Sequence, residues 1–154
     1  MAAKLIGTDS NPTTNSGLGY IRYTDFTCEQ TGVLTSLRVY CLVNGNVRAA
    51  IYTSVGSYAV TLLAETGSEA LVAGAYRDMA LTTSVNLTAG THYCLAVQSD
   101  TTGGNGYLES AGYKHSHELS AYGAFPATAT NTASDAYIEG VQGWGNINGF
   151  FQFI

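Results

Sequence analysis

The clearest strand pattern in this chain is Val85-Asn-Leu-Thr-Ala-Gly-Thr-His-Tyr-Cys-Leu-Ala-Val-Gln98. One strand ends before Thr88-Ala-Gly90, whose small residues favour a tight turn. After this turn, Tyr93, Leu95 and Val97 point to the same face of a second strand. Hydrophobic residues at every second position are typical of an antiparallel strand that buries one of its faces.

The same alternation occurs in Leu34-Thr-Ser-Leu-Arg-Val-Tyr-Cys-Leu-Val-Asn-Gly-Asn-Val-Arg-Ala-Ala-Ile-Tyr52. Asn44-Gly45 is a typical hairpin turn, so we expect a strand over 33–43 to pair with a strand over 46–53. The residues expected to face the core are Val33, Leu37, Val39, Cys41 and Val43, followed by Val47, Ala49 and Ile51. Together these patterns predict an all-β fold, an antiparallel β-sandwich.

Composition narrows the class of protein. The chain has 154 residues, which suits one domain, and 45% of them are hydrophobic, which is enough to build a core. Only 11% are charged, against roughly 25% in an ordinary soluble domain. A neutral surface rich in Gly, Tyr and small polar residues is typical of proteins in virions, in packed assemblies or outside cells.

Charge and hydropathy argue against nucleic acid and lipid membranes as partners. The net charge is −5, and the six Lys and Arg residues are scattered, so no basic surface for nucleic acid is expected. No apolar run approaches the roughly 20 residues that a membrane-spanning helix needs. The first residues, Met1-Ala-Ala-Lys-Leu-Ile-Gly-Thr8, lack the apolar core of a secretory signal.

The chain divides into an N-terminal arm over 1–17 and a single sandwich domain over 18–154. Further strands are expected over 18–28, 61–66, 69–72, 76–81, 84–87, 91–98, 107–110, 136–141 and 150–154. Between 111 and 148 the alternation fades. We therefore expect a long irregular segment in the C-terminal third, of the kind that often serves function or packing.

Four phrases carry a resemblance to a known group of proteins. They are Gly32-Val-Leu-Thr-Ser-Leu-Arg-Val-Tyr40, Val47-Arg-Ala-Ala-Ile-Tyr-Thr53, Leu62-Leu-Ala-Glu-Thr66 and Leu87-Thr-Ala-Gly-Thr-His-Tyr-Cys-Leu-Ala-Val97. In these phrases the chain resembles jelly-roll β-sandwich modules of phage structural proteins and secreted microbial surface proteins. The likeness spans about residues 20–100 and rests on positions that form the fold. It implies a jelly-roll-like sandwich that displays or binds something.

His115-Ser-His117-Glu118 is the best candidate for a metal site. On an extended segment His115 and His117 share a face, so both could bind Zn²⁺ or Ni²⁺, with Glu118 or a distant Asp as the third ligand. The alternative is that this segment is solvated or lies in an interface. Because such pairs of His are common in loops, no metal or other cofactor is expected.

Catalytic motifs are missing from the sequence. The only other histidine is His92, and no Gly-x-Ser-x-Gly elbow occurs, although a triad can assemble from any order along the chain. The carboxylates that could act in pairs are Glu109, Glu118, Asp135 and Glu139. Cys28, Cys41 and Cys94 form no metal or redox motif, and Cys41 is expected to be buried. We therefore expect no enzyme and no catalytic residue.

Aromatic residues cluster in the second half of the chain. They are Tyr107, Tyr113, Tyr122, Phe125, Tyr137 and Trp144. Rings on loops among Gly, Asn and Ser can anchor a protein interface or stack on sugar rings. The alternative is that some of these rings, Tyr137 and Trp144 among them, only cap the core.

The sequence thus favours a non-enzymatic structural protein of a phage virion surface, similar to a capsid decoration or cement protein. Its expected partners are copies of itself and a capsid lattice, reached through the arm over 1–17, the segment over 111–148 and the last strand. One alternative is a carbohydrate-binding β-sandwich module that uses Trp144 and Tyr residues. Another is a subunit of an extracellular filament. The expected location is the virion or, for the alternatives, outside the cell.

Overall fold

The computed structural model describes residues 2–15, 17–102, 106–109, 115–131, 133–135 and 137–148. These residues form strands and no helix, so none of them contributes a helix that could cross a bilayer. The strands are β1 (Ala2–Gly7), β2 (Thr14–Asn15), β3 (Tyr20–Thr27), β4 (Gly32–Tyr40), β5 (Gly45–Val55), β6 (Tyr58–Glu65), β7 (Glu69–Leu71), β8 (Tyr76–Leu87), β9 (His92–Ser99), β10 (Gly106–Glu109), β11 (His115–Leu119), β12 (Ala133–Asp135), β13 (Tyr137–Glu139) and β14 (Val141–Ile147).

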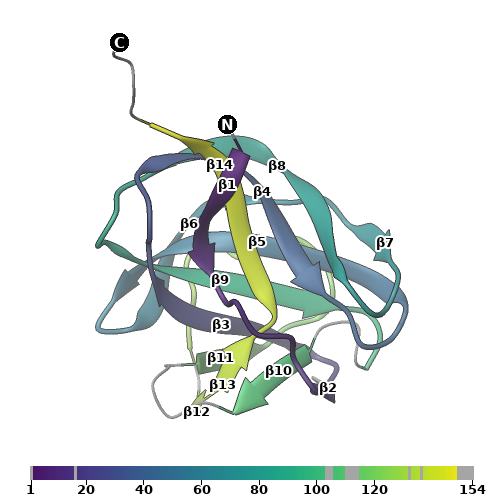
Figure 1. Ribbon diagram of the computed structural model, residues 1–154. Helices are drawn as coiled ribbons and strands as arrows, with labels where there is room; N and C mark the ends of the chain where they lie inside the picture. Colours follow the sequence, from purple (N-terminus) through teal and green to yellow (C-terminus); the bar gives the residue numbers. More distant parts are fainter. Residues whose placement is uncertain are drawn as a thin grey trace.

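Two large antiparallel sheets pack face to face. One has four strands in the order β1-β14-β4-β8, and the other has seven, ordered β12-β11-β3-β9-β5-β6 with β7 paired to β5. In Figure 1 the four-stranded sheet lies in front, and its strands cross those of the larger sheet behind it. A small third sheet, β13-β10-β2, lies at one end. The predicted all-β antiparallel sandwich is confirmed.

Alternation along β5 and β9 builds two separate cores. Val47, Ala49 and Ile51 of β5 pack with Leu95 and Val97 of β9 in the main core between the two sheets, as their spacing predicts. The residues between them point to the opposite face of the larger sheet. That face carries a second apolar cluster, made of Ile21, Tyr23, Ala50, Tyr52, Ala59, Cys94, Ala96 and Phe125.

A segment over 120–131, here called the strap, covers this second cluster. The amide of Ala129 donates to the Val60 carbonyl at 2.9 Å, and the amide of Leu62 donates to the Ala127 carbonyl at 3.0 Å. The Tyr52 hydroxyl donates to the Pro126 carbonyl at 2.6 Å. The larger sheet is therefore buried on both faces where the strap crosses it.

The predicted hairpin at Asn44-Gly45 is wrong, because β4 and β5 belong to different sheets. Gly45 lacks the positive φ that such a turn requires. Close packing explains the glycine instead, since a Cβ at this position would lie 2.9 Å from Thr101. The two-residue turn with positive φ is Gly56-Ser57, at 60° and 72°, and it joins β5 to β6.

The strands expected over 76–81 and 84–87 form one strand, β8. Its register with β4 shifts between the partners Leu34 and Ser36. This bulge changes which residues of β4 face inward: Leu34 and Leu37 are both fully buried, whereas Val33 is only half-buried. Val43, expected in the core, is 39% exposed because it lies in the crossover after β4.

The segment over 111–148 is less irregular than predicted, since β11 to β14 lie within it. β14 is an inner strand of the four-stranded sheet. Its inward positions include Gly143 and Gly145, and a Cβ on Gly143 would lie 2.7 Å from a methyl group of Ile6. Because these inward residues have no side chain, the strand shows no hydrophobic alternation.

The N-terminal segment contributes to the sandwich. β1 forms an edge of the four-stranded sheet beside β14, and its Leu5 and Ile6 are fully buried in the main core. The strand expected over 150–154 lies outside the described residues. Cys28, Cys41 and Cys94 are all buried and free.

Candidate docking surface

The outer face of the four-stranded sheet carries a group of aromatic and paired polar side chains. It is called here the outer sheet face and comprises Ser36, Arg38, Tyr40, Tyr76, Asp78, Gln142 and Trp144. These residues alternate with inward residues such as Leu37 and Met79. The strand register places Trp144 opposite Ser36, and Arg38 between Gln142 and Asp78.

Trp144 is held in place by polar neighbours. The Arg38 guanidinium lies 3.7 Å from the centroid of the indole ring, which is a close cation–π contact. The indole Nε1 donates to Gln142 Oε1 at 2.9 Å, and Gln142 Nε2 donates to the Thr8 carbonyl at 2.8 Å. The ring is therefore ordered before any partner arrives.

Arg38 is held from its other side by Asp78. Its Nε donates to Asp78 Oδ1 at 2.5 Å, and its Nη2 donates to Oδ2 at 3.3 Å. This two-point contact fixes the plane of the guanidinium. It also compensates the charge, so the centre of the outer sheet face is close to neutral.

Two tyrosines extend the surface beside this row. The rings of Tyr40 and Tyr76 meet edge to face with centroids 5.2 Å apart. The Tyr76 hydroxyl donates to the Ser10 carbonyl at 2.7 Å. Burial raises the pKa of Tyr76, and nearby Asp9 adds to the shift, so the hydroxyl remains a neutral donor.

The predicted aromatic contact residues that the structure describes do not form one cluster. Of them, only Trp144 lies on the outer sheet face. Tyr107 and Tyr137 stack with centroids 4.3 Å apart in the small sheet, and Tyr113 lies outside the described residues. Tyr122 and Phe125 belong to the strap. Alternation along β4 predicts that Tyr40 faces away from the core, but the sequence alone gives no sign that it shares a face with Trp144.

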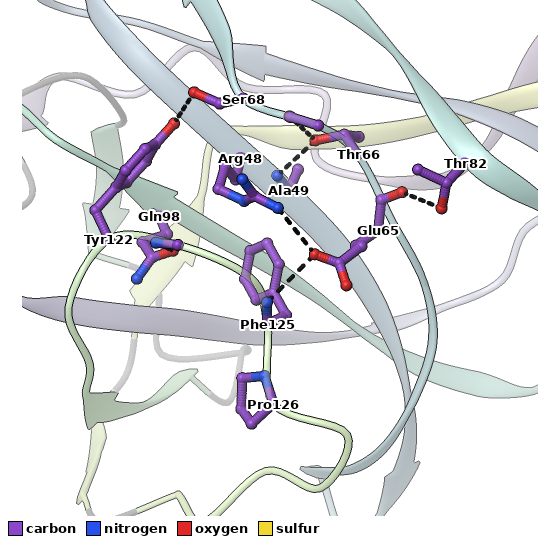
Figure 2. Close-up of polar contacts among 12 residues, drawn as sticks. Arg48, Ala49, Glu65, Thr66, Ser68, Thr82, Gln98, Tyr122, Phe125 and Pro126 are labelled. Carbon is purple, nitrogen blue, oxygen red and sulfur yellow. Dashed lines mark hydrogen bonds and ion pairs between the residues drawn. The ribbon is translucent and has the colours of Figure 1, made fainter.

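Figure 2 shows why the strap is a structural element. Phe125 is 5% exposed, and its amide donates to Glu65 Oε1 at 3.3 Å. The same carboxylate oxygen lies 3.2 Å from Arg48 Nη2. The Tyr122 hydroxyl bonds the Ser68 hydroxyl at 2.6 Å. Through these contacts Tyr122 and Phe125 are engaged within the chain.

The metal candidates do not converge. His115 and His117 lie on one face of β11 with ring centroids 5.8 Å apart, and fully buried His115 faces Glu139 at 3.2 Å. Glu118 points to the opposite face, where its carboxylate accepts hydrogen bonds from Tyr23 and Thr130. Strand alternation accounts for this separation.

Wherever the structure describes side chains, no three His, Cys, Asp or Glu residues lie close enough to share a metal ion. The side chains of Glu109 and Asp135, two of the four candidate carboxylates, lie outside that part of the chain. The other two, Glu118 and Glu139, are committed to the buried contacts described above.

The outer sheet face thus offers a preorganised Trp, two Tyr rings and a compensated Arg–Asp pair. Such a surface can receive a protein partner or a flat sugar ring. The sequence matches no protein-family model and no curated protein. What the chain does must therefore be inferred from its own surfaces.

Proposed function

We propose that this chain is a structural component of a phage virion surface, acting by docking its outer sheet face against copies of itself or a capsid lattice. The observation that carries the proposal is the ordered row of Trp144, Arg38 and Asp78 on a sheet face. Trp144 and Arg38 are only half-buried in this face, whereas the segment over 8–12 borders it at Gln142 and Tyr76.

The chemistry of the outer sheet face favours a protein partner. Trp, Tyr and Arg are the residues that contribute most to protein–protein binding, and this face presents all three. The rings of Trp144 and Tyr76 are already ordered by hydrogen bonds, so docking costs little side-chain entropy. With only 11% charged residues in the chain, few charges need to be desolvated when two such surfaces meet.

Light scattering on the purified chain, alone and with emptied capsids, tests the proposal. We expect association that Trp144→Ala weakens at least tenfold, because a central ring is removed from the contact. Leu119→Ala is the matched control, since this residue is 74% exposed but lies on β11 of the other sheet. A chain that stays monomeric and ignores capsids, or that associates equally well after Trp144→Ala, would contradict the proposal.

A second candidate function is carbohydrate binding through the same surface. It is favoured by the amide of Gln142 and the Arg38–Asp78 pair beside the indole, since such groups can bond sugar hydroxyls around a stacked ring. A monomer that binds glycans on an array and loses them after Trp144→Ala would support this candidate over docking.

A further inference from the structure

A cluster of polar side chains lies on the face of the larger sheet that the strap also covers, beyond the second apolar cluster. Its members are Asp25, Thr27, Ser54 and His92. Neighbouring strands bring it together: Thr27 of β3 pairs with His92 of β9, and Asp25 pairs with Cys94. Ser54 comes from β5 on the other side of β9. Residues distant in sequence thus share one position on a rigid sheet.

The three strands form a chain of hydrogen bonds. The Ser54 hydroxyl donates to Asp25 Oδ1 at 2.6 Å, and Asp25 Oδ2 lies 2.8 Å from His92 Nδ1. On the far side of the imidazole, His92 Nε2 lies 3.3 Å from Thr27 Oγ1. In the neutral tautomer that donates from Nδ1 to the carboxylate, the imidazole presents Nε2 to the threonine hydroxyl as an acceptor.

Burial and exposure differ along this chain of bonds. The Asp25 side chain is 8% exposed, whereas the His92 side chain is 54% exposed. Thr27 is also exposed. The carboxylate is therefore shielded and fixed from two sides, and the imidazole and hydroxyl that it orients are accessible to a ligand.

A hollow of about 410 Å³ opens beside His92, lined by Ser54, Gly56, Ser57, Thr91 and His92. This volume is in the range of small-molecule sites. Gly56 and Ser57 form the turn with positive φ. Thr27 is not one of the lining residues: it lies on β3, across His92 from the turn that follows β5, so the hollow can hold the alcohol part of an ester whose carbonyl lies over Thr27.

We propose that Thr27, His92 and Asp25 form a nucleophilic site for acyl transfer from small esters. This inference is independent of the docking function and departs from the expectation that the chain has no catalytic residue. Thr27 is the nucleophile and His92 the general base; Asp25 is a positioning residue that fixes the imidazole.

The proposed reaction has two balanced steps. Thr27 Oγ1 bonds to the ester carbonyl carbon while His92 Nε2 takes the hydroxyl proton, and the electron pair of the carbonyl double bond moves onto the carbonyl oxygen. The carbonyl then re-forms, the bond to the alcohol oxygen breaks, and the leaving alcohol takes the proton from His92. Water attacks the acylated Thr27 by the same route, which releases the carboxylic acid and restores the hydroxyl.

The nearby thiol is excluded as the nucleophile. Cys94 is fully buried, and burial raises the pKa of its thiol to about 12, so it remains protonated and unreactive. Ser54 already donates its proton to Asp25. Thr27 is the hydroxyl that faces the free nitrogen of the imidazole.

Mixing the full chain with p-nitrophenyl acetate tests the site. We expect a burst of nitrophenolate and, after rapid quenching, one acetyl group on the peptide that contains Thr27. Thr27→Val should abolish this adduct, Thr27→Ser should retain it, and His92→Gln should slow acylation about a hundredfold. Thr83→Val, an exposed threonine on β8, is the matched control and should behave like the unchanged chain.

The positioning role of Asp25 has its own readout. A low-field proton resonance of the His92 imidazole should be present in the unchanged chain and absent in Asp25→Asn, together with slowed acylation and an unchanged circular dichroism spectrum. The proposal is overturned if folded protein carries the acetyl group elsewhere than on Thr27. It is also overturned if His92→Gln releases nitrophenolate as fast as the unchanged chain.

Discussion

Glycine has two distinct tasks in the sandwich, and β14 shows the stricter one. Gly145 faces inward, and a Cβ there would lie 1.9 Å from the Val33 carbonyl oxygen. Gly143 also faces inward, but its nearest neighbours are methyl groups of Ile6 and Leu34. By contrast, Gly56 is needed for its positive φ and has nothing within 4 Å. Close contact with the backbone therefore requires glycine at position 145, and the positive φ of the turn requires glycine at position 56.

Substitution of the β14 glycines should separate these effects. Gly145→Ala should lower the free energy of unfolding by about 3 kcal/mol because main chain must move, and Gly143→Ala by about 1 kcal/mol because side-chain ends can shift. Gly67→Ala is the control, with nothing within 4 Å and an expected change near zero or slightly stabilising. Urea denaturation measures all three, and equal losses at 143 and 145 would contradict this interpretation.

The strap shows how one segment stabilises a whole sheet face. It covers Tyr23 and Tyr52, whose rings meet edge to face with centroids 5.2 Å apart. The pKa of each phenol is raised, first by burial and, for Tyr23, also by its bond to Glu118. An unfolded chain releases these phenol protons at about pH 10, but the folded chain keeps them to higher pH.

The stability that these phenols contribute is therefore complete below about pH 10 and decreases as pH rises above it. Tyr52→Phe should make this alkaline decrease less steep. At neutral pH it should cost about 1 kcal/mol, because the bond to the Pro126 carbonyl is lost. Denaturation followed from about pH 8 to about pH 11, on either side of the ordinary pKa of a phenol, measures both effects. Tyr20→Phe is the control, and an unchanged slope in Tyr52→Phe would refute the assignment.

β1 makes the N-terminal segment part of the folded domain. Deletion of residues 1–8 removes Leu5 and Ile6 from the main core and exposes the edge of β14. Losing two buried side chains costs more than about 4 kcal/mol, a large part of the stability of a domain this size. We expect the truncated chain to lose its cooperative thermal transition. A sharp calorimetric transition near the original temperature would show instead that this segment is a dispensable arm.

At the scale of the whole molecule, the sequence predicts the sheets better than their connections. Alternation in β5 and β9 correctly assigns inward and outward residues, because each strand is buried between two cores. It fails in β14, where glycines replace inward side chains. It also fails at Asn44-Gly45, because a crossover between sheets and a hairpin share the same turn residues.

The candidate sites were harder to predict because they depend on register. Trp144 meets Arg38 only through the pairing of β14 with β4. Likewise, His92 reaches Asp25 and Thr27 only through the pairing of β9 with β3. Local spacing places His115, His117 and Glu118 close together along the chain, yet alternation separates Glu118 from the other two. Pairing partners, rather than sequence neighbours, determine these surfaces.

Because the chain has one tryptophan, fluorescence of Trp144 reports directly on the outer sheet face. Association with other copies or with emptied capsids should shift its emission to shorter wavelength and protect it from acrylamide, since docking removes water from the indole. The Leu119→Ala chain should show the same change. Association that leaves both the emission and the quenching of Trp144 unchanged would mean that the chain docks through a different surface.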